Sequence, residues 1–285
     1  MFKINNPYIP AGGFGFKGEK EMSFLDHLEE LRWHLLRSAI AIISFMVVAF
    51  FFIQDIYRIV ILGPAKTDFW TYRKLCELGH KVNIESLCVK QMNFSLISRE
   101  VSGQFMMSIT TSAIAGLVFA FPYVFWEIWN FIKPGLRKSE KKAARGAVFY
   151  VTLLFFMGIL FGYYVVAPFA INFLVNFQID PSIKNQFDIN SYISVLATLT
   201  LVCGLTFQLP IAIFVLSRIG VVGPVFLRSH RKHSVVIILI VAAVITPSPD
   251  IISQILVAIP LYILFEVSIY VSANVYKARA KEFRV

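Results

Sequence analysis

The sequence contains six long stretches in which Asp, Glu, Lys and Arg are absent or nearly so. A helix that crosses a bilayer needs about 20 apolar residues, and 57% of the 285 residues are hydrophobic, a fraction outside the range of soluble proteins. The alternation that barrel strands require is missing, so only helices fit. We therefore predict an all-α integral membrane protein with six transmembrane helices. The six stretches are 38–54, 101–126, 146–179, 189–217, 233–249 and, with Glu266 as its one charge, 251–276.

The lysines and arginines outside these stretches are unevenly distributed. The N-terminal arm, the second and fourth loops and the C-terminal tail carry 19 of them, whereas the first and third loops carry eight. Because such residues favour the cytoplasmic side, both termini are predicted to lie in the cytoplasm, with the protein in the cytoplasmic (inner) membrane. The net charge of +10 then reflects topology and attraction to anionic membrane lipid, and we expect no nucleic-acid partner.

The chain divides into three regions by composition. Residues 1–22 contain two prolines and a glycine-rich run, which indicates a disordered cytoplasmic arm. A start that resembles a capping box at Ser23 opens the membrane domain, predicted as 23–275. Residues 276–285 are predicted to form a basic cytoplasmic tail.

The first loop, about 54–100, is the only connection long enough to form a structured cap. Gly63 and Pro64 should end any helical extension of the first span, because proline lacks an amide donor and disfavours helix in the residue before it. Cys76 and Cys88 lie in this loop. If the loop is exported to an oxidising compartment, the two cysteines either form a disulfide or stay unpaired.

Prolines interrupt four of the six stretches. A proline inside a helix removes a backbone hydrogen bond and bends the helix, so these spans are predicted to form a curved, concave bundle. The fifth stretch covers only about 25 Å at 1.5 Å per residue, against a hydrocarbon core near 30 Å. It turns directly into the sixth, so spans five and six are predicted to be short. The prolines are Pro122, Pro168, Pro210 and Pro260.

No combination of residues indicates an enzyme. The histidines show no zinc-type spacing, and no P-loop or Gly-x-Ser-x-Gly elbow is present, so we expect neither a metal nor a cofactor. The candidate binding residues are two carboxylates on the cytoplasmic side, Glu30 and Glu140, which can bind guanidinium groups of a ligand bidentately. Each has a structural alternative: Glu140 can stabilise the N-terminus of the third span, and Glu30 can pair with His34 or with nearby basic residues.

Three polar residues lie within or next to the spans. Gln208 can face an inner cavity, since Pro210 frees a carbonyl nearby, or it can form a hydrogen bond between helices. Glu127 is predicted to lie at the interface and extend toward water. Glu266 is predicted to make a buried structural contact rather than to relay protons.

Four motifs, in order around the six spans, resemble the TatC family, the receptor subunit of the twin-arginine protein translocase. They are the run from Phe24 to Arg32, the run from Trp129 through Pro134 to Leu136 with Glu140 after it, Phe207-Gln208-Leu209-Pro210, and Thr246-Pro247 with Ser253-Gln254. The resemblance covers about 22–275. It implies a membrane receptor that recognises N-terminal signal peptides with two consecutive arginines on folded cargo.

The resemblance also implies roles for individual residues. The positions that match the family's signal-peptide site are Glu30, Arg32, Phe131 and Glu140. Those that match intramembrane or partner contacts, toward single-span proteins of the TatA and TatB type, are Gln208, Thr246 and Gln254. Structural positions are Pro64, Pro134, Pro210 and Glu266. Self-association in a receptor complex is implied as well, and Gln208 stands where many members carry Glu.

Two other classes of function compete with this interpretation. Broken helices and intramembrane polar groups also suit a secondary transporter of small molecules, although the first and last three spans show no repeat symmetry. An intramembrane enzyme would need a catalytic pair, and the sequence offers none.

Overall fold

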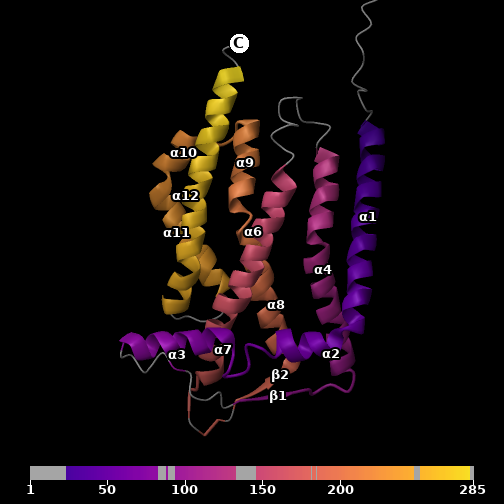
Figure 1. The fold of residues 1–285 in the computed structure, drawn as a ribbon, viewed down its shortest axis with the longest axis vertical. Helices are drawn as coiled ribbons and strands as arrows, with labels where there is room; N and C mark the ends of the chain where they lie inside the picture. The colour runs from indigo at the N-terminus through magenta and orange to yellow at the C-terminus, as the bar shows by residue number, and fades with distance from the viewer. Residues whose placement is uncertain are drawn as a thin grey trace, which may run out of the picture.

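The computed structural model describes residues 24–82, 88, 94–132, 146–180, 182–183, 185–246 and 251–282. Its long helices run side by side, and the start of α1 and the end of α12 lie together at one end, which we call the terminal end (Figure 1). The other end carries α2, η1, α3, β1 and β2, which we call the cap. The first half of the chain comprises α1 (Phe24–Phe51), α2 (Ile53–Asp55), η1 (Ile56–Ile61), α3 (Trp70–Val82), β1 (Ser95–Ile97) and α4 (Gly103–Ile132). The second half comprises α6 (Ala147–Phe161), η5 (Gly162–Val166), α7 (Ala167–Asn176), β2 (Gln186–Asp188), α8 (Ile189–Thr206), α9 (Leu209–Ile219), α10 (Pro224–Ser229), α11 (Arg231–Ile245) and α12 (Ile251–Glu282).

Five segments are long and apolar enough to cross a membrane: 28–51, 103–132, 148–176, 189–219 and 253–277. The remaining predicted span, the fifth, corresponds to α11, whose 15 residues cover about 22 Å. The predicted shortness of span five is therefore confirmed. Span six is not short: α12 has 32 residues and continues through the start of the predicted tail. Glu266 lies within this helix, and Arg231 pairs with its carboxylate.

The prolines act in two different ways. Pro122 and Pro260 lie inside the uninterrupted helices α4 and α12. Pro168 and Pro210 stand in the first turns of α7 and α9, where a missing amide proton costs no hydrogen bond. The third span accordingly passes through the π-helix η5, and the fourth is interrupted between α8 and α9.

Tyrosines attach the cap to the bundle. The extension of the first span ends at η1 before Gly63-Pro64, as predicted, and leaves carbonyl groups without helical partners. The hydroxyls of Tyr163 and Tyr192 donate to carbonyls at the end of η1, those of Val60 and Ile61, at 2.7 and 2.8 Å. Tyr72 of α3 donates to Pro64 at 3.2 Å and to Pro168 at 2.9 Å. Pro64 is thus buried at the junction of cap and bundle.

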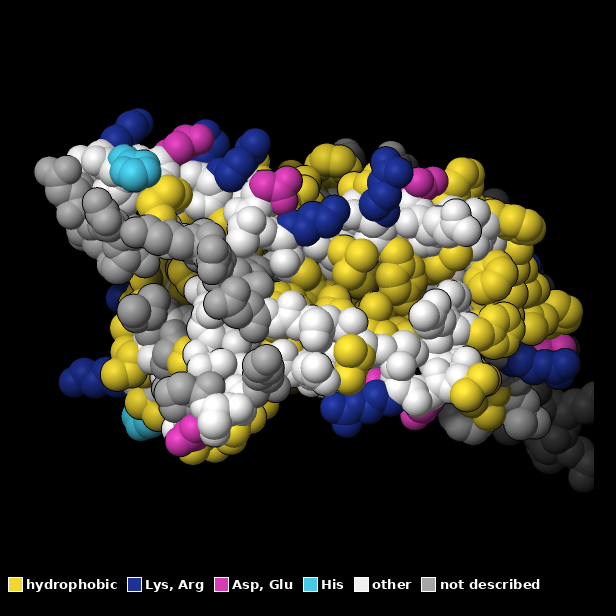
Figure 2. All heavy atoms as spheres, turned by 90° about the horizontal axis from the view of Figure 1, so that it is seen from below, with side chains coloured by type: hydrophobic (Ala, Val, Ile, Leu, Met, Phe, Trp, Pro, Cys, Tyr) yellow, Lys and Arg dark blue, Asp and Glu magenta, His cyan; other side chains and the backbone are white. Residues whose placement is uncertain are grey.

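The cap also holds a short parallel sheet and a disulfide. Strands β1 and β2 pair with Leu96 opposite Phe187. Cys76 and Cys88 form a disulfide, one of the two alternatives that the sequence left open. Seen from this end, charged side chains lie along the border and hydrophobic side chains between them (Figure 2).

Helix α1 packs mainly on α4 and fixes the geometry of the terminal end. At Gly116 of α4 an added Cβ would lie 2.7 Å from the backbone nitrogen of Met46, so the two backbones are in close contact there. Most of α1 is otherwise exposed within the chain, which suits a surface in contact with lipid. The close packing sets the register that brings His34 of α1 beside Glu127 of α4.

Candidate functional site

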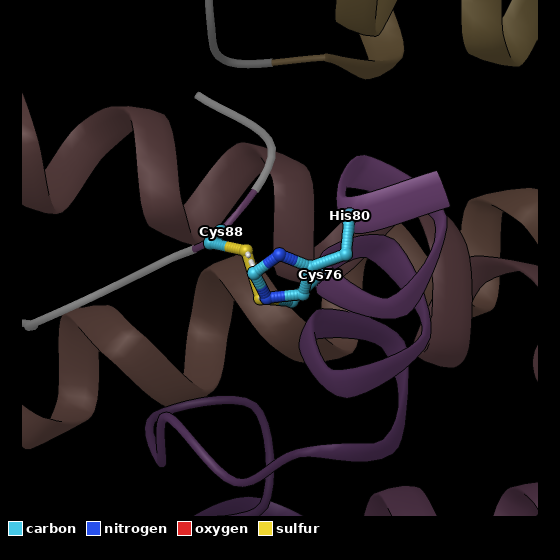
Figure 3. The surroundings of a disulfide bond; sticks show 3 residues. All are labelled: Cys76, His80 and Cys88. Carbon is cyan, nitrogen blue, oxygen red and sulfur yellow. Dashed lines mark hydrogen bonds between the residues drawn. A yellow bond between two sulfur atoms is a disulfide. The ribbon is translucent and has the colours of Figure 1, made fainter. Parts of the chain in front are cut away.

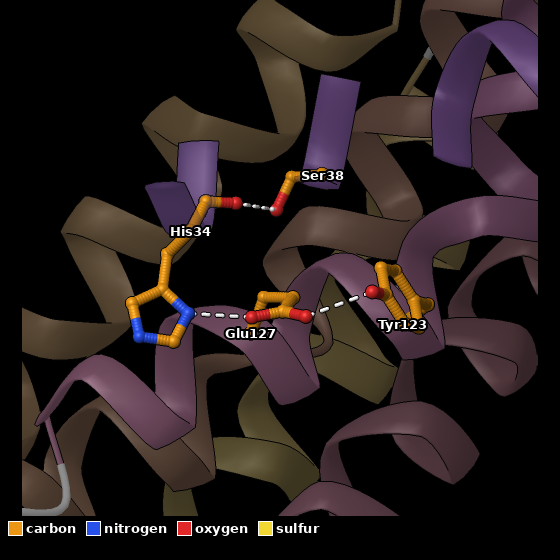
Figure 4. Close-up of polar contacts among 4 residues, drawn as sticks. All are labelled: His34, Ser38, Tyr123 and Glu127. Carbon is orange, nitrogen blue, oxygen red and sulfur yellow. Dashed lines mark hydrogen bonds and ion pairs between the residues drawn. The ribbon is translucent and has the colours of Figure 1, made fainter. Parts of the chain in front are cut away.

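A buried carboxylate joins α1 to α4 near the terminal end. Glu127 is 2% exposed, and its Oε2 lies 2.5 Å from Nδ1 of His34. The hydroxyl of Tyr123, one turn earlier in α4, donates to Oε1 at 2.8 Å, and Ser38 donates to the carbonyl of His34 at 2.8 Å (Figure 4). The prediction that Glu127 extends toward water at the interface is therefore wrong. Its two donors satisfy the carboxylate inside the helix pair.

Glu30 lies one turn before His34 in α1. Its Oε2 is buried and has no hydrogen-bond partner among the described residues. The alternative that Glu30 pairs with His34 is wrong, because the imidazole Nδ1 is used by Glu127. A buried carboxylate oxygen without a donor is costly, so this atom is suited to receive one from a ligand.

Phe131, near the end of α4, completes a set that we call the α1–α4 site: Glu30, His34, Glu127 and Phe131. The ring centroids of His34 and Phe131 are 6.1 Å apart in an edge-to-face arrangement. Two of the four predicted signal-binding residues therefore lie near His34: Phe131 contacts its ring, and Glu30 lies one turn earlier on the same helix. Arg32 is exposed and, two positions after Glu30, does not share its face of the helix. Glu140 and Pro134 lie outside the described residues.

Gln208 precedes the break before α9. Its Nε2 donates to the carbonyl of Val151 in α6 at 3.0 Å, so the structure shows the interhelical hydrogen bond that was one of its two predicted roles. Its Oε1 is buried with no partner in the described part of the chain. Pro210 is buried next to it.

The two other predicted partner residues lie near the turn between α11 and α12. Thr246 is buried, and its hydroxyl donates to the carbonyl of Ala242 in its own helix at 3.0 Å. Gln254 donates from Nε2 to the carbonyl of Leu239 at 3.0 Å and so joins α12 to α11. Both side chains thus support the short helix.

Glu266 makes the predicted structural contact, though it is only partly buried. Arg231, at the start of α11, donates to its Oε2 at 2.7 Å, and Tyr262 donates to Oε1 at 3.1 Å. The side chain of Glu266 is 33% exposed and that of Arg231 is 49% exposed. This pair explains how a charge is accommodated in the sixth span.

Sequence reasoning missed the cluster of His34, Tyr123 and Glu127. Tyr123 and Glu127 are four residues apart on one helix, so their spacing could have predicted the hydrogen bond between these two. His34 is 93 positions from Glu127 along the chain. Only the packing of α1 on α4 reveals that contact.

Comparison with known proteins agrees with this arrangement. A family model described as Sec-independent protein translocase protein (TatC) matches residues 26–260. The TatC protein of Blattabacterium sp. subsp. Periplaneta americana is 42% identical over 92% of this chain and 100% of its own length, and TatCy of Bacillus subtilis is 32% identical over 92% of each. A crystal structure of the twin-arginine translocase receptor TatC in DDM superposes with a TM-score of 0.65 at 30% identity, covering 86% of this chain and 99% of that one. The chain therefore belongs to the TatC family of Sec-independent protein translocase components.

Proposed function

We propose that this protein binds twin-arginine signal peptides at the α1–α4 site and recruits single-span partners to export folded proteins. The observation that carries the proposal is the buried Oε2 of Glu30, which has no donor among the described residues. An arginine of the ligand supplies the missing donor. A guanidinium group presents two parallel N–H groups to a carboxylate, which a lysine ammonium cannot do.

The second arginine needs a second carboxylate, and Glu140 is our candidate. It lies among five cations between Lys133 and Lys142, which favour a charged carboxylate and repel isolated cations. The family resemblance gives Glu140 this role. The His34–Glu127 pair positions Glu30 and Phe131 by fixing α1 on α4.

The proposed orientation places the terminal end, and with it the α1–α4 site, in the cytoplasm. Its support is the asymmetry of lysines and arginines along the sequence. In that orientation a signal peptide meets the site before it enters the inner membrane, and the cap faces the exported side.

Binding of a synthetic twin-arginine peptide to the purified protein in nanodiscs tests the proposal. We expect binding that falls tenfold or more when Arg-Arg is replaced by Lys-Lys, because the forked hydrogen bonds are lost while the charge is kept. Fluorescence anisotropy of a labelled peptide measures the affinity. Equal affinity for both peptides would count against recognition of guanidinium and favour simple charge attraction.

We further propose that Gln208 offers its unpaired Oε1 to a polar group of a single-span partner of the TatA or TatB type. Replacing Gln208 with Leu should reduce crosslinking of such a partner to α9, while peptide affinity stays within twofold. The reason is that the site of the substitution lies away from α1, and an interhelical hydrogen bond in a membrane contributes only about 0.6 kcal/mol. Unchanged partner crosslinking in Gln208→Leu contradicts this role.

A further inference from the structure

Three metal-ligating side chains converge in the cap, far from the α1–α4 site. Cys76 and His80 lie one turn apart on α3, and Cys88 approaches them from the segment that follows (Figure 3). The Nε2 atom of His80 lies 3.5 Å from Sγ of Cys76 and 3.9 Å from Sγ of Cys88. All three ligand atoms are within 4.8 Å of one another. We propose that the cap carries a redox-gated zinc site, in which Cys76, His80 and Cys88 bind one Zn²⁺ when the disulfide is reduced.

The separations fit the coordination geometry of zinc. With Zn–S bonds of about 2.3 Å and a Zn–N bond of about 2.0 Å, tetrahedral angles place nitrogen and sulfur about 3.5 Å apart. Both observed separations between Nε2 and Sγ are within about 0.4 Å of that value. Two thiolates on one zinc are about 3.8 Å apart. After reduction, the two sulfur atoms must therefore move apart to about that distance to bind the ion.

The helix that presents the site is held independently of the disulfide. Thr71 donates a hydrogen bond to the carbonyl of Tyr164, and Tyr72 donates to Pro64 and Pro168. Opening the disulfide therefore leaves α3 attached to the bundle, with Cys76 and His80 still on one face. His80 is exposed, so an ion can enter from solvent, and water can fill the fourth position.

The ligand set selects a thiophilic ion. Thiolate and imidazole favour zinc over magnesium and calcium, which prefer oxygen. Two thiolates and a neutral imidazole give a neutral complex with Zn²⁺. Arg73 and Lys81 add positive charge to α3, while Lys74 is paired with Glu77 at 2.7 Å. Nearby cations favour the thiolate forms that bind metal.

The redox step balances as an ordinary thiol–disulfide exchange. A dithiol donates two electrons and two protons to the Cys76–Cys88 bond and becomes a disulfide itself, leaving two free thiols in the cap. Binding of Zn²⁺ then releases those two protons to solvent. In the reverse exchange, a disulfide accepts two electrons from the thiolates of Cys76 and Cys88 and two protons from solvent and becomes a dithiol, the Cys76–Cys88 bond re-forms, both Zn–S bonds break, and Zn²⁺ is released. Histidine spacing alone does not predict this site, because only one of its three ligands is a histidine; Cys76 and His80, four residues apart on one helix, are the sequence signal.

Zinc titration of the full-length protein in detergent tests the proposal. Reduction with a phosphine consumes one water, forms the phosphine oxide and yields the two thiols, and no competing thiol is introduced. After removal of excess reductant, competition with a chromophoric chelator should show one Zn²⁺ bound per reduced chain and none per oxidised chain. Cobalt as a probe should give a thiolate-to-metal charge-transfer band in the reduced protein only.

Matched variants separate this site from adventitious binding. His80→Ala should lower the zinc affinity tenfold or more, and Cys76→Ser should abolish the charge-transfer band, whereas His230→Ala and Cys203→Ser should change neither. Alkylation of the reduced wild-type protein gives the same test if a cysteine variant fails to fold. Absence of stoichiometric zinc in the reduced protein, or an unchanged affinity in His80→Ala, overturns the proposal. Neither result bears on binding of signal peptides at the other end of the bundle.

Discussion

Replacing Glu140 with Gln is expected to weaken binding of a twin-arginine peptide by tenfold or more, and Glu30→Gln should do the same. A charge-assisted hydrogen bond contributes about 1.5 to 3 kcal/mol, and each 1.4 kcal/mol corresponds to a factor of ten. If each carboxylate takes one arginine, the double variant should lose about a hundredfold or more. The affinity of a labelled peptide for protein in nanodiscs is the measurement.

Glu29→Gln is the matched control for Glu30. It removes the same charge one residue away, from a side chain that is exposed. Its effect on affinity should stay within the range of a screened surface charge, about twofold. If Glu140 only stabilises the N-terminus of the third span, Glu140→Gln costs the helix at most about 1 kcal/mol and leaves affinity unchanged. That outcome removes Glu140 from the proposed site and leaves the membership in the TatC family intact.

His34→Ala is expected to destabilise the protein by about 3 kcal/mol or more. Removing the imidazole leaves the buried carboxylate of Glu127 without one of its two partners, and an uncompensated buried charge costs about 3 to 5 kcal/mol. Glu127 would keep only the hydrogen bond from Tyr123, inside a helix pair where it is 2% exposed. Denaturant unfolding in mixed micelles, followed by tryptophan fluorescence, measures the change in the free energy of unfolding.

The Arg231–Glu266 pair supplies the comparison. Its side chains are 49% and 33% exposed, so Arg231→Ala should cost at most about 1 kcal/mol. Adding Glu127→Gln to the His34→Ala variant should recover part of the lost free energy of unfolding. The reason is that the buried carboxylate is replaced by a neutral amide, so no unpaired charge stays buried. If His34→Ala is no more damaging than Arg231→Ala, the buried pair does not hold α1 on α4.

The fold could be predicted largely because the membrane simplifies the problem. Long uncharged runs identify the spans, and Gly63-Pro64 identifies where the first helix ends. The length of α12 could not be predicted in the same way. Spans five and six were both expected to be short because the fifth turns directly into the sixth, but α12 runs for 32 residues.

The candidate site shows the same limit. Glu30 and Phe131 were predicted from motifs, but the burial of Glu127 contradicts the rule that a carboxylate at the end of a span extends toward water. The rule failed because two donors, His34 and Tyr123, satisfy the carboxylate locally. One of them comes from another helix, and pairings of that kind follow from the packing of backbones at positions such as Gly116.

The neighbouring helices α11 and α12 differ greatly in length. At 1.5 Å per residue, the 32 residues of α12 extend about 48 Å and the 15 residues of α11 about 22 Å. The first exceeds the full bilayer with its headgroups, about 40 to 45 Å, and the second is less than the hydrocarbon core of about 30 Å. The last turns of α12, in the predicted basic tail, can project into water, but a hydrocarbon core of constant thickness cannot match the 15 residues of α11. The annulus of lipid around this protein is therefore uneven, with its shallowest sector beside α11, and a helix that approaches there meets a thinner barrier than one that approaches along α12.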